Sequence, residues 1–164
     1  MRQKAREWAI SHHGDQKYGD HPYSVHLDAV AKIAQPFGEM AGVVAYLHDV
    51  VEDTDITVEQ VSSQFGVLVA ACVAILSDEP GVDRKESKAI TYKKMSLVTG
   101  EEELALLVKT ADRLANVRAC IHDGKLDKLS TYQSEHPVFK QSVYRAGLCD
   151  GLWDELNSLI KASD

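Results

Sequence analysis

The sequence Tyr46-Leu-His-Asp-Val-Val-Glu-Asp53 places four polar residues inside an otherwise apolar run. The run is long enough for a helix over roughly residues 39–52, on which positions four apart share one stripe. His48 is therefore expected beside Glu52, and Asp49 beside Asp53. Three carboxylates on one buried face would repel one another and would be costly to bury unpaired. The pattern predicts a bound divalent cation; the alternative is a solvated polar face, which the apolar neighbours disfavour.

Composition and charge limit the classes of function. The chain has 164 residues, enough for one domain with a sizeable core, and its formal net charge is −7. We expect neither nucleic acid nor a membrane surface as a partner, because an acidic protein repels both. A small anionic substrate is compatible with the charge, since a metal and a few lysines can hold it. The sequence indicates no particular oligomeric state.

Cysteines and apolar runs indicate the compartment. The N-terminus is charged and is not followed by the apolar segment of a signal peptide. The longest apolar run, residues 67–76, is too short to cross a bilayer and is expected to form the central buried helix. The three cysteines, Cys72, Cys120 and Cys149, have no CxxC spacing. We expect reduced thiols in a cytoplasmic protein.

The periodicity of apolar residues predicts helices throughout, and no stretch alternates in the manner of a strand. Thr57 followed by Gln60 has the spacing of a capping box. We expect an all-α fold: a single domain over residues 1–164, built as a bundle of about eight helices. The expected helices cover residues 2–13, Pro22 to about Gly38, 39–52, a short stretch after Thr57, 67–76, 85–98, 102–121 and 136–162.

Two further polar residues lie on apolar helical faces. His26 occurs in Tyr23-Ser-Val-His26, and Asp112 occurs in Val108-Lys-Thr-Ala-Asp112. Taken singly, each is more often a core residue satisfied by a hydrogen bond. Together with His48 and Asp49 they supply two imidazoles and two carboxylates from three helices. Such mixed ligands suit Mn²⁺, Fe²⁺, Mg²⁺ or Zn²⁺ in a catalytic role, and the absence of thiolates argues against structural zinc.

The order of these residues resembles the H…HD…D signature of the HD-domain metal-dependent phosphohydrolases. Three segments resemble the hydrolase domain of the RelA/SpoT family more narrowly. His12 to His26 is similar to its opening motif, His48-Asp-Val-Val-Glu-Asp-Thr54 to HDxxEDT, and Lys109-Thr-Ala-Asp-Arg-Leu-Ala-Asn-Val-Arg118 to K-x-A-D-R-L-x-N-x-R. The resemblance covers roughly residues 5–120. The chain ends soon afterwards, so we expect a small alarmone hydrolase without a synthetase domain.

The resemblance implies an activity and a set of roles. The activity is hydrolysis of the 3′-pyrophosphate of guanosine 3′,5′-bis(diphosphate) (ppGpp) or a related nucleotide, with release of pyrophosphate. The implied cofactor is Mn²⁺, held by four residues: His26, His48, Asp49 and Asp112. The implied acidic pair is Glu52 and Asp53; we assign Glu52 as the general base, with Asp53 positioning the water or assisting. The alternative for Glu52 is a salt bridge to a neighbouring lysine or arginine.

The substrate contacts implied by the resemblance are Lys17 and Asn116. Lys17 stands where the family commonly has an arginine; a lysine can lie over a base but lacks the planar guanidinium that stacks. Guanine specificity is therefore left open. Lys109 and Arg113 either contact phosphates or support the acidic cluster. The polar, basic segment 77–94 could cover the phosphates, but we expect most of it to be a solvated loop and helix face.

Two other functions compete with ppGpp hydrolysis. One is an HD-domain phosphohydrolase that acts on another nucleotide or on a phosphorylated cofactor. The other is a non-catalytic module that binds a nucleotide for regulation. The presence of all four expected ligands and both acidic residues counts against the second.

Overall fold

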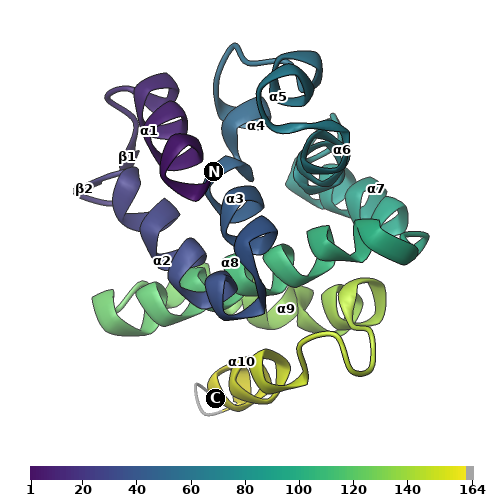
Figure 1. Cartoon of the computed structure of the whole chain (residues 1–164). Helices are drawn as coiled ribbons and strands as arrows, with labels where there is room; N and C mark the ends of the chain where they lie inside the picture. The colour runs from purple at the N-terminus through teal and green to yellow at the C-terminus, as the bar shows by residue number, and fades with distance from the viewer. Residues whose placement is uncertain (162–164) are drawn as a thin grey trace.

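The computed structural model describes residues 1–161, and almost all of their regular structure is helical (Figure 1). The α-helices are α1 (Arg2–His13), α2 (Ser24–Ala34), α3 (Glu39–Leu47), α4 (Val50–Asp53), α5 (Val58–Phe65), α6 (Val67–Leu76), α7 (Arg84–Ser96), α8 (Glu103–Asp123), α9 (Leu126–Val143) and α10 (Asp150–Lys161). Two 3-10 turns, η1 (Gln35–Phe37) and η2 (Gly100–Glu102), precede α3 and α8. The all-α prediction is confirmed.

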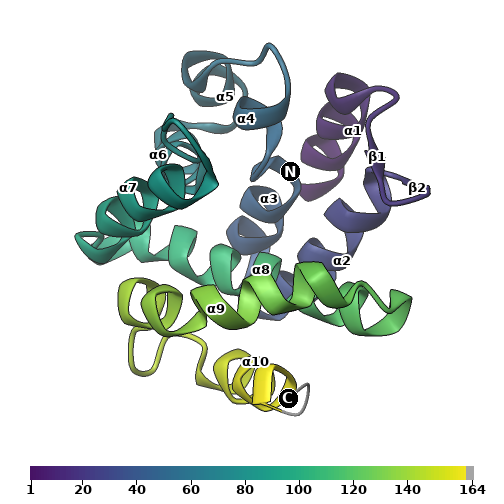
Figure 2. The same cartoon turned by 180° about the vertical axis from the view of Figure 1, so that it is seen from behind.

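Helix α8 is the centre of the fold. It contacts α2, α3, α6, α9 and α10, and it crosses the molecule with α2 and α3 on one side and α9 and α10 on the other (Figures 1 and 2). Its residues are buried without interruption from Ala105 to Ala115, including Lys109, Asp112 and Arg113. A helix buried all round must satisfy such polar side chains internally. The cationic and acidic residues of α8 therefore point to a polar site inside the fold.

Several local signals act as predicted. Thr57 and Gln60 form the capping box that begins α5, and Gly124 ends α8 in the left-handed conformation with φ 67°. Helix α6 has the predicted bounds, but Val67 is 78% exposed, so the central buried helix is α8 rather than α6. Every helix within residues 1–161 is too short or too polar to cross a lipid bilayer. The three cysteines are free and buried.

The helix predicted over residues 39–52 is interrupted at His48 and Asp49. Helix α3 ends at Leu47 and α4 begins at Val50, while Asp49 has φ −105° and ψ 0°. In a continuous helix the Ala45 carbonyl accepts from the Asp49 amide, and here the His48 ring competes for that carbonyl with Nδ1 at 2.6 Å. The prediction of one continuous helix is therefore wrong, although the Asp53 amide still donates to the Asp49 carbonyl at 2.9 Å, one turn of helix apart.

Residues 17–22, in which no strand was predicted, form a small antiparallel hairpin. Strand β1 (Lys17–Tyr18) pairs with β2 (His21–Pro22), and Gly19 at the turn has φ 59°. Pro22 therefore ends a strand, and α2 begins at Ser24 rather than at the proline. A proline is tolerated at the edge of a sheet because it has no N–H to leave unpaired.

The helix predicted over residues 136–162 is also wrong in its bounds, and residue 162 lies outside the described part of the chain. Helix α9 starts ten residues earlier, at Leu126, runs through Pro137 and ends at Val143; α10 follows from Asp150. Proline costs an interior helix one hydrogen bond, but Tyr132 and Phe139 on either side of Pro137 are buried. Helix α9 packs against both α7 and α8.

Candidate metal centre and active-site cleft

A cleft of about 350 Å³ opens where the hairpin, the α3–α4 break, α7, α8 and α9 meet. Most of the side chains that line it are ionisable or aromatic. They are Lys17, Tyr18, Tyr23, His26, Asp49, Glu52, Asp78, Arg84, Lys88, Lys109, Asp112, Arg113, Asn116, Lys128 and Tyr132, together with Gly19. The cleft thus brings together predicted site residues from four separate parts of the sequence.

The four expected metal ligands converge at the floor of this cleft. His26 Nε2 lies 3.1 Å from Asp112 Oδ1, and His48 Nε2 lies 3.0 Å from Asp49 Oδ2. His48 Nε2 is 3.5 Å from Asp112 Oδ1, and His26 Nε2 is 4.0 Å from Asp49 Oδ2. The ligand atoms of His26, His48 and Asp49 all lie within 4.8 Å of one another, so this group could hold a metal ion.

The orientation of His48 fits a bound cation. Its Nδ1 lies 2.6 Å from the Ala45 carbonyl, which fixes the ring and leaves Nε2 as the acceptor in the neutral tautomer. That buried Nε2 has no hydrogen-bond partner among the described residues, although it faces two carboxylates. Burial lowers the pKa of His48, but the charges of Asp49 and Asp112 outweigh burial and raise it well above its usual value. The carboxylates thus strongly favour a positive charge at this point.

Asp112 is held by neighbours on its own helix. Lys109 Nζ lies 3.2 Å from Oδ2, and Asn116 Nδ2 donates to Oδ1 at 2.9 Å. Burial raises the pKa of Asp112, but Lys109 and His48 outweigh it and hold that pKa well below its ordinary value. Of the two roles predicted for Lys109, the structure shows the supporting contact to the acidic cluster.

Glu52 and Asp53 lie on different sides of the short helix α4. Glu52 lines the cleft, and its Oε1 accepts from the Asp78 backbone amide at 2.6 Å instead of forming a salt bridge. Burial, and then the Asp78 charge, raise the pKa of Glu52. Asp53 is not among the residues that line the cleft; its Oδ2 accepts from Gln16 Nε2 at 2.9 Å.

Two tyrosines flank His26. The Tyr18 ring stacks on the imidazole with centroids 4.6 Å apart and planes 12° apart, while Tyr23 packs tilted at 5.5 Å. The Tyr23 hydroxyl donates to Asp49, and the Tyr18 hydroxyl donates to Asn116 Oδ1 at 2.6 Å. Lys17, beside Tyr18 on β1, is exposed at the mouth of the cleft.

Comparison with known proteins assigns this arrangement to a family. A family model described as an HD domain matches residues 5–141. The chain belongs to the HD-domain family. The resemblance predicted from the H…HD…D signature is thereby confirmed.

Curated relatives of this HD domain are RelA/SpoT-type proteins. It is 36% identical over 162 residues to a guanosine-3′,5′-bis(diphosphate) 3′-pyrophosphohydrolase of Aquifex aeolicus, covering 96% of this chain and 22% of that protein. It is 35% identical over 154 residues to a probable enzyme of the same name from Synechocystis, covering 87% of this chain and 20% of that protein. The chain thus spans about a fifth of the length of these relatives.

Solved structures share the fold of the HD domain. One, described as a metazoan ortholog of SpoT that hydrolyses ppGpp, aligns with a TM-score of 0.82 at 23% identity, covering 98% of this chain and 94% of that chain. Another, from Listeria monocytogenes EGD-e, aligns with a TM-score of 0.68 at 26% identity, covering 87% of this chain and 97% of that chain. The helical HD-domain architecture therefore extends over nearly the whole chain.

Part of segment 77–94, predicted to be solvated, instead forms one wall of the cleft in this HD domain. Asp78, Arg84 and Lys88 all line it, and Lys88 Nζ pairs with Asp78 Oδ2 at 2.6 Å. The signal in the sequence is the spacing of Arg84 and Lys88, which places two cations on one helix face. The sequence could not show that this face turns inward, because α7 packs mainly on α9, which is distant in the sequence.

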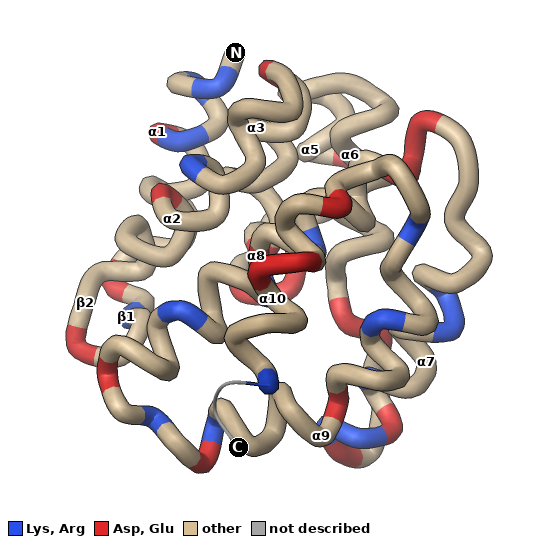
Figure 3. Tube along the Cα trace, turned by 90° about the horizontal axis from the view of Figure 1, so that it is seen from below, with Lys and Arg blue, Asp and Glu red and all other residues tan. Residues whose placement is uncertain are grey.

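Helix α9 adds residues that were not predicted from the sequence, among them Lys128, Tyr132 and Glu135. Glu135 accepts from Arg84 Nε at 2.9 Å and from Arg113 Nη2 at 3.1 Å, so it links α7, α8 and α9 where charges of both signs lie close together (Figure 3). Arg113 also stacks on Tyr132, 4.6 Å from the ring centroid. Among the described residues Arg113 thus pairs with Glu135 rather than with the acidic cluster, and its contact with phosphates stays a prediction.

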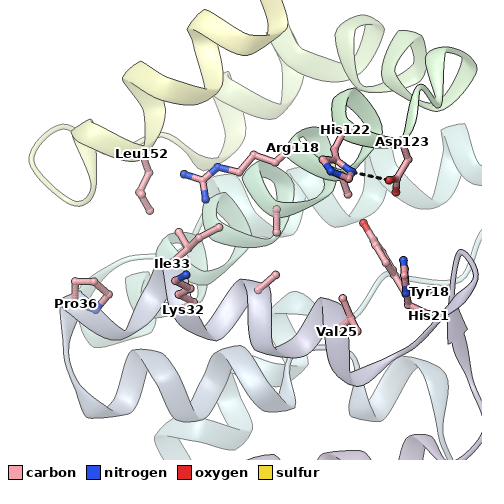
Figure 4. Close-up of a pocket in the computed structure, with 13 residues that line it drawn as sticks. Tyr18, His21, Val25, Lys32, Ile33, Pro36, Arg118, His122, Asp123 and Leu152 are labelled. Carbon is pink, nitrogen blue, oxygen red and sulfur yellow. Dashed lines mark hydrogen bonds and ion pairs between the residues drawn. The ribbon is translucent and has the colours of Figure 1, made fainter.

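A second cavity, of about 670 Å³, lies outside the cleft between α2, the end of α8 and the start of α10 (Figure 4). Its walls are largely apolar, with Val25, Ile33 and Leu152 among them. Its charged groups are mostly paired: His122 contacts Asp123 at 2.8 Å, and Arg118 contacts Glu155 at 2.6 Å. This outer groove is the larger cavity, but the smaller cleft has the groups expected of an active site.

Proposed function

We propose that this HD domain is a metal-dependent hydrolase of the 3′-pyrophosphate of ppGpp or a closely related nucleotide, with residues 1–164 acting as one domain. The observation that carries the proposal is the convergence of the His26, His48, Asp49 and Asp112 ligand atoms beside Glu52 in a cleft edged by cations. The names of the relatives support the choice of substrate. The free buried cysteines suit the reducing cytoplasm, the compartment that we propose.

The proposed cofactor is Mn²⁺, held by the two imidazoles and two carboxylates. A donor set of nitrogen and oxygen suits this ion, and His48 Nε2, which has no hydrogen-bond partner among the described residues, supports it. Bound there, Mn²⁺ supplies Lewis-acid chemistry: it polarises a phosphoryl oxygen and lowers the pKa of water. Asn116 and Lys109 keep the Asp112 carboxylate in place for that ligand set.

Glu52 is the proposed general base. Its carboxylate faces the cleft, the Asp78 amide fixes it, and its raised pKa makes it a stronger base than an ordinary glutamate. It takes the proton of the attacking water as the new P–O bond forms. The bond from that phosphorus to the ribose 3′-oxygen breaks, giving pyrophosphate and a nucleoside 5′-diphosphate whose 3′-oxygen takes up a proton. Asp53 assists indirectly, from the other side of α4 through Gln16.

Lys17 and Asn116 are the proposed nucleotide contacts. Lys17 at the cleft mouth lies over the base as a cation. Asn116 uses one N–H and one lone pair in its present bonds, which leaves one of each for a sugar hydroxyl. Arg84, Lys88 and Lys128 line the same cleft and balance the phosphate charge that develops on the leaving group.

A substrate panel tests this function. The protein is incubated with MnCl₂ and, separately, with ppGpp, GTP, ATP, GDP and NADP, and products are separated by anion-exchange chromatography. We expect pyrophosphate and GDP from ppGpp, with no turnover after treatment with EDTA. Cleavage of another compound but not of ppGpp would assign the site to that substrate. Binding of ppGpp without turnover would assign it to a regulatory module.

A further inference from the structure

We infer that Tyr18 is a positioning residue for the metal centre: its hydroxyl holds Asp112 through Asn116, and its ring holds His26. Tyr18 is outside the expected ligand set and outside the expected substrate contacts. The inference rests on the proposed metal site but not on the identity of the nucleotide.

The first link is a chain of two hydrogen bonds. The Tyr18 hydroxyl donates to Asn116 Oδ1 at 2.6 Å, and Asn116 Nδ2 donates to Asp112 Oδ1 at 2.9 Å. That same carboxylate oxygen lies 3.1 Å from His26 Nε2 and 3.5 Å from His48 Nε2. The opposite orientation of the amide would turn Oδ1 toward the carboxylate, where two acceptors would repel. Tyr18 thus fixes the amide that directs the ligand oxygen.

The second link is aromatic packing. His48 is oriented by the bond from its Nδ1 to the Ala45 carbonyl, whereas His26 is held by ring contacts and by Asp112 Oδ1, 3.1 Å from its Nε2. The near-parallel stack of Tyr18, with planes 12° apart, covers one face of the His26 ring. Tyr23 packs against the same imidazole at 56°. Removing the Tyr18 ring would therefore free the imidazole to turn away from the carboxylates.

The hairpin explains why a tyrosine on a two-residue strand can do this. Tyr18 pairs with His21 across β1 and β2, which sets its direction toward α8, and its contact with Asn116 spans 98 positions of sequence. Figure 4 shows Tyr18 and His21 at the end of the outer groove, and Tyr18 also lines the cleft. The tyrosine is thus the partition between the two cavities and supports the metal ligands from that position.

Metal affinity, measured without any nucleotide, tests the inference. Wild type, Tyr18→Phe and Tyr18→Ala are stripped with EDTA, dialysed and titrated with MnCl₂ by calorimetry. Loss of a contact that orients a ligand typically weakens metal affinity by about 10–100-fold. We expect the Kd for Mn²⁺ to rise about tenfold in Tyr18→Phe, which keeps the ring stack, and toward about a hundredfold in Tyr18→Ala. Tyr144→Phe, whose ring packs on Trp153, is the matched control and should bind as wild type.

A double-mutant cycle separates positioning from general stability. If the hydroxyl acts through Asn116, Tyr18→Phe combined with Asn116→Ala should lose no more Mn²⁺ affinity than Asn116→Ala alone. Additive losses, or a Tyr18→Phe variant with wild-type Kd, would overturn the inference. Circular dichroism identifies any variant that fails to fold, and Tyr18→Phe decides the question if Tyr18→Ala does not fold. A protein that binds Mn²⁺ as expected but leaves ppGpp intact would overturn the proposed function and not this inference.

Discussion

Tyr18 lines two cavities, which differ in how completely their polar groups are paired. The outer groove is the larger, about 670 Å³ against about 350 Å³, but its cations are largely matched by neighbouring acids such as Glu155 and Asp123. The inner cleft holds the buried Asp112 and the partly buried Asp49 beside Nε2 of His48, which has no hydrogen-bond partner among the described residues. Burying charge without full pairing costs folding energy, so such a cluster indicates a site for a ligand rather than a structural feature. The volume of a cavity shows only how large a ligand could fit, whereas incompletely paired charged groups indicate where a ligand binds.

Replacing one aspartate in each cavity should give the largest difference between the two cavities. We expect Asp112→Ala to abolish Mn²⁺ binding and hydrolysis, because it removes a ligand contributed by α8. Asp123→Ala, in the outer groove, should keep both. Asp112→Ala leaves Lys109 buried without its partner, so its melting temperature should fall while its helical circular dichroism persists. Metal analysis of the purified proteins is the measurement, and stoichiometric Mn²⁺ in Asp112→Ala would contradict the ligand set.

Replacing one glutamate beside each cavity should give the second-largest difference in activity. Glu52→Gln should bind Mn²⁺ normally but lose about 10²–10⁴-fold in kcat, the range contributed by a general base. Glu155→Gln, which weakens the pair with Arg118 beside the outer groove, should leave kcat unchanged. Single-turnover kinetics with saturating metal would separate the chemical step from binding. Full activity in a metal-loaded Glu52→Gln would remove the base from the mechanism.

The two cavities also separate what the sequence predicts from what it does not. His26, His48, Asp49 and Asp112 could be recognised because a polar residue on an apolar helical face is conspicuous wherever its partners lie. The helix break at His48 could not be predicted, because it depends on a side chain that competes for a main-chain carbonyl. Nor could the inward face of α7, which is set by contact with α9.

The misplaced start of α9 has the same origin. Pro137 favours a helix start near residue 136, but tertiary packing of Tyr132 and Phe139 carries the helix through the proline. Lys128 and Glu135 were missed for that reason, because both precede the helix start predicted at residue 136. Local patterns therefore identified the chemistry of the inner cleft but not the walls that enclose it.

The pH dependence of the inner cleft offers a finer test. The pKa of Glu52 is raised by burial and then by the Asp78 charge, and a general base works only when ionised. The acid limb of kcat/KM should therefore lie above that of an ordinary glutamate. Asp78→Asn removes one negative charge, so the pKa of Glu52 should fall and the acid limb should move to lower pH. Glu79→Gln, whose side chain pairs with Lys94, is the neighbouring control and should leave the limb in place. An unmoved limb in Asp78→Asn would show that another group controls it.

The smallest effect should come from two exposed lysines, one in each cavity. Lys17 lines the cleft and Lys32 lines the outer groove. A cation over an exposed ring is worth about 0.5–1 kcal/mol, so Lys17→Ala should raise KM for the nucleotide by about two- to fivefold with little change in kcat. Lys32→Ala should leave both parameters unchanged, because the groove takes no part in the proposed reaction. Steady-state kinetics on ppGpp beside the same compound with adenine in place of guanine completes the test. If Lys17 contacts the base, the variant should lose discrimination between the two as well as affinity. A rise in KM for Lys32→Ala would show instead that nucleotide reaches past Tyr18 into the outer groove.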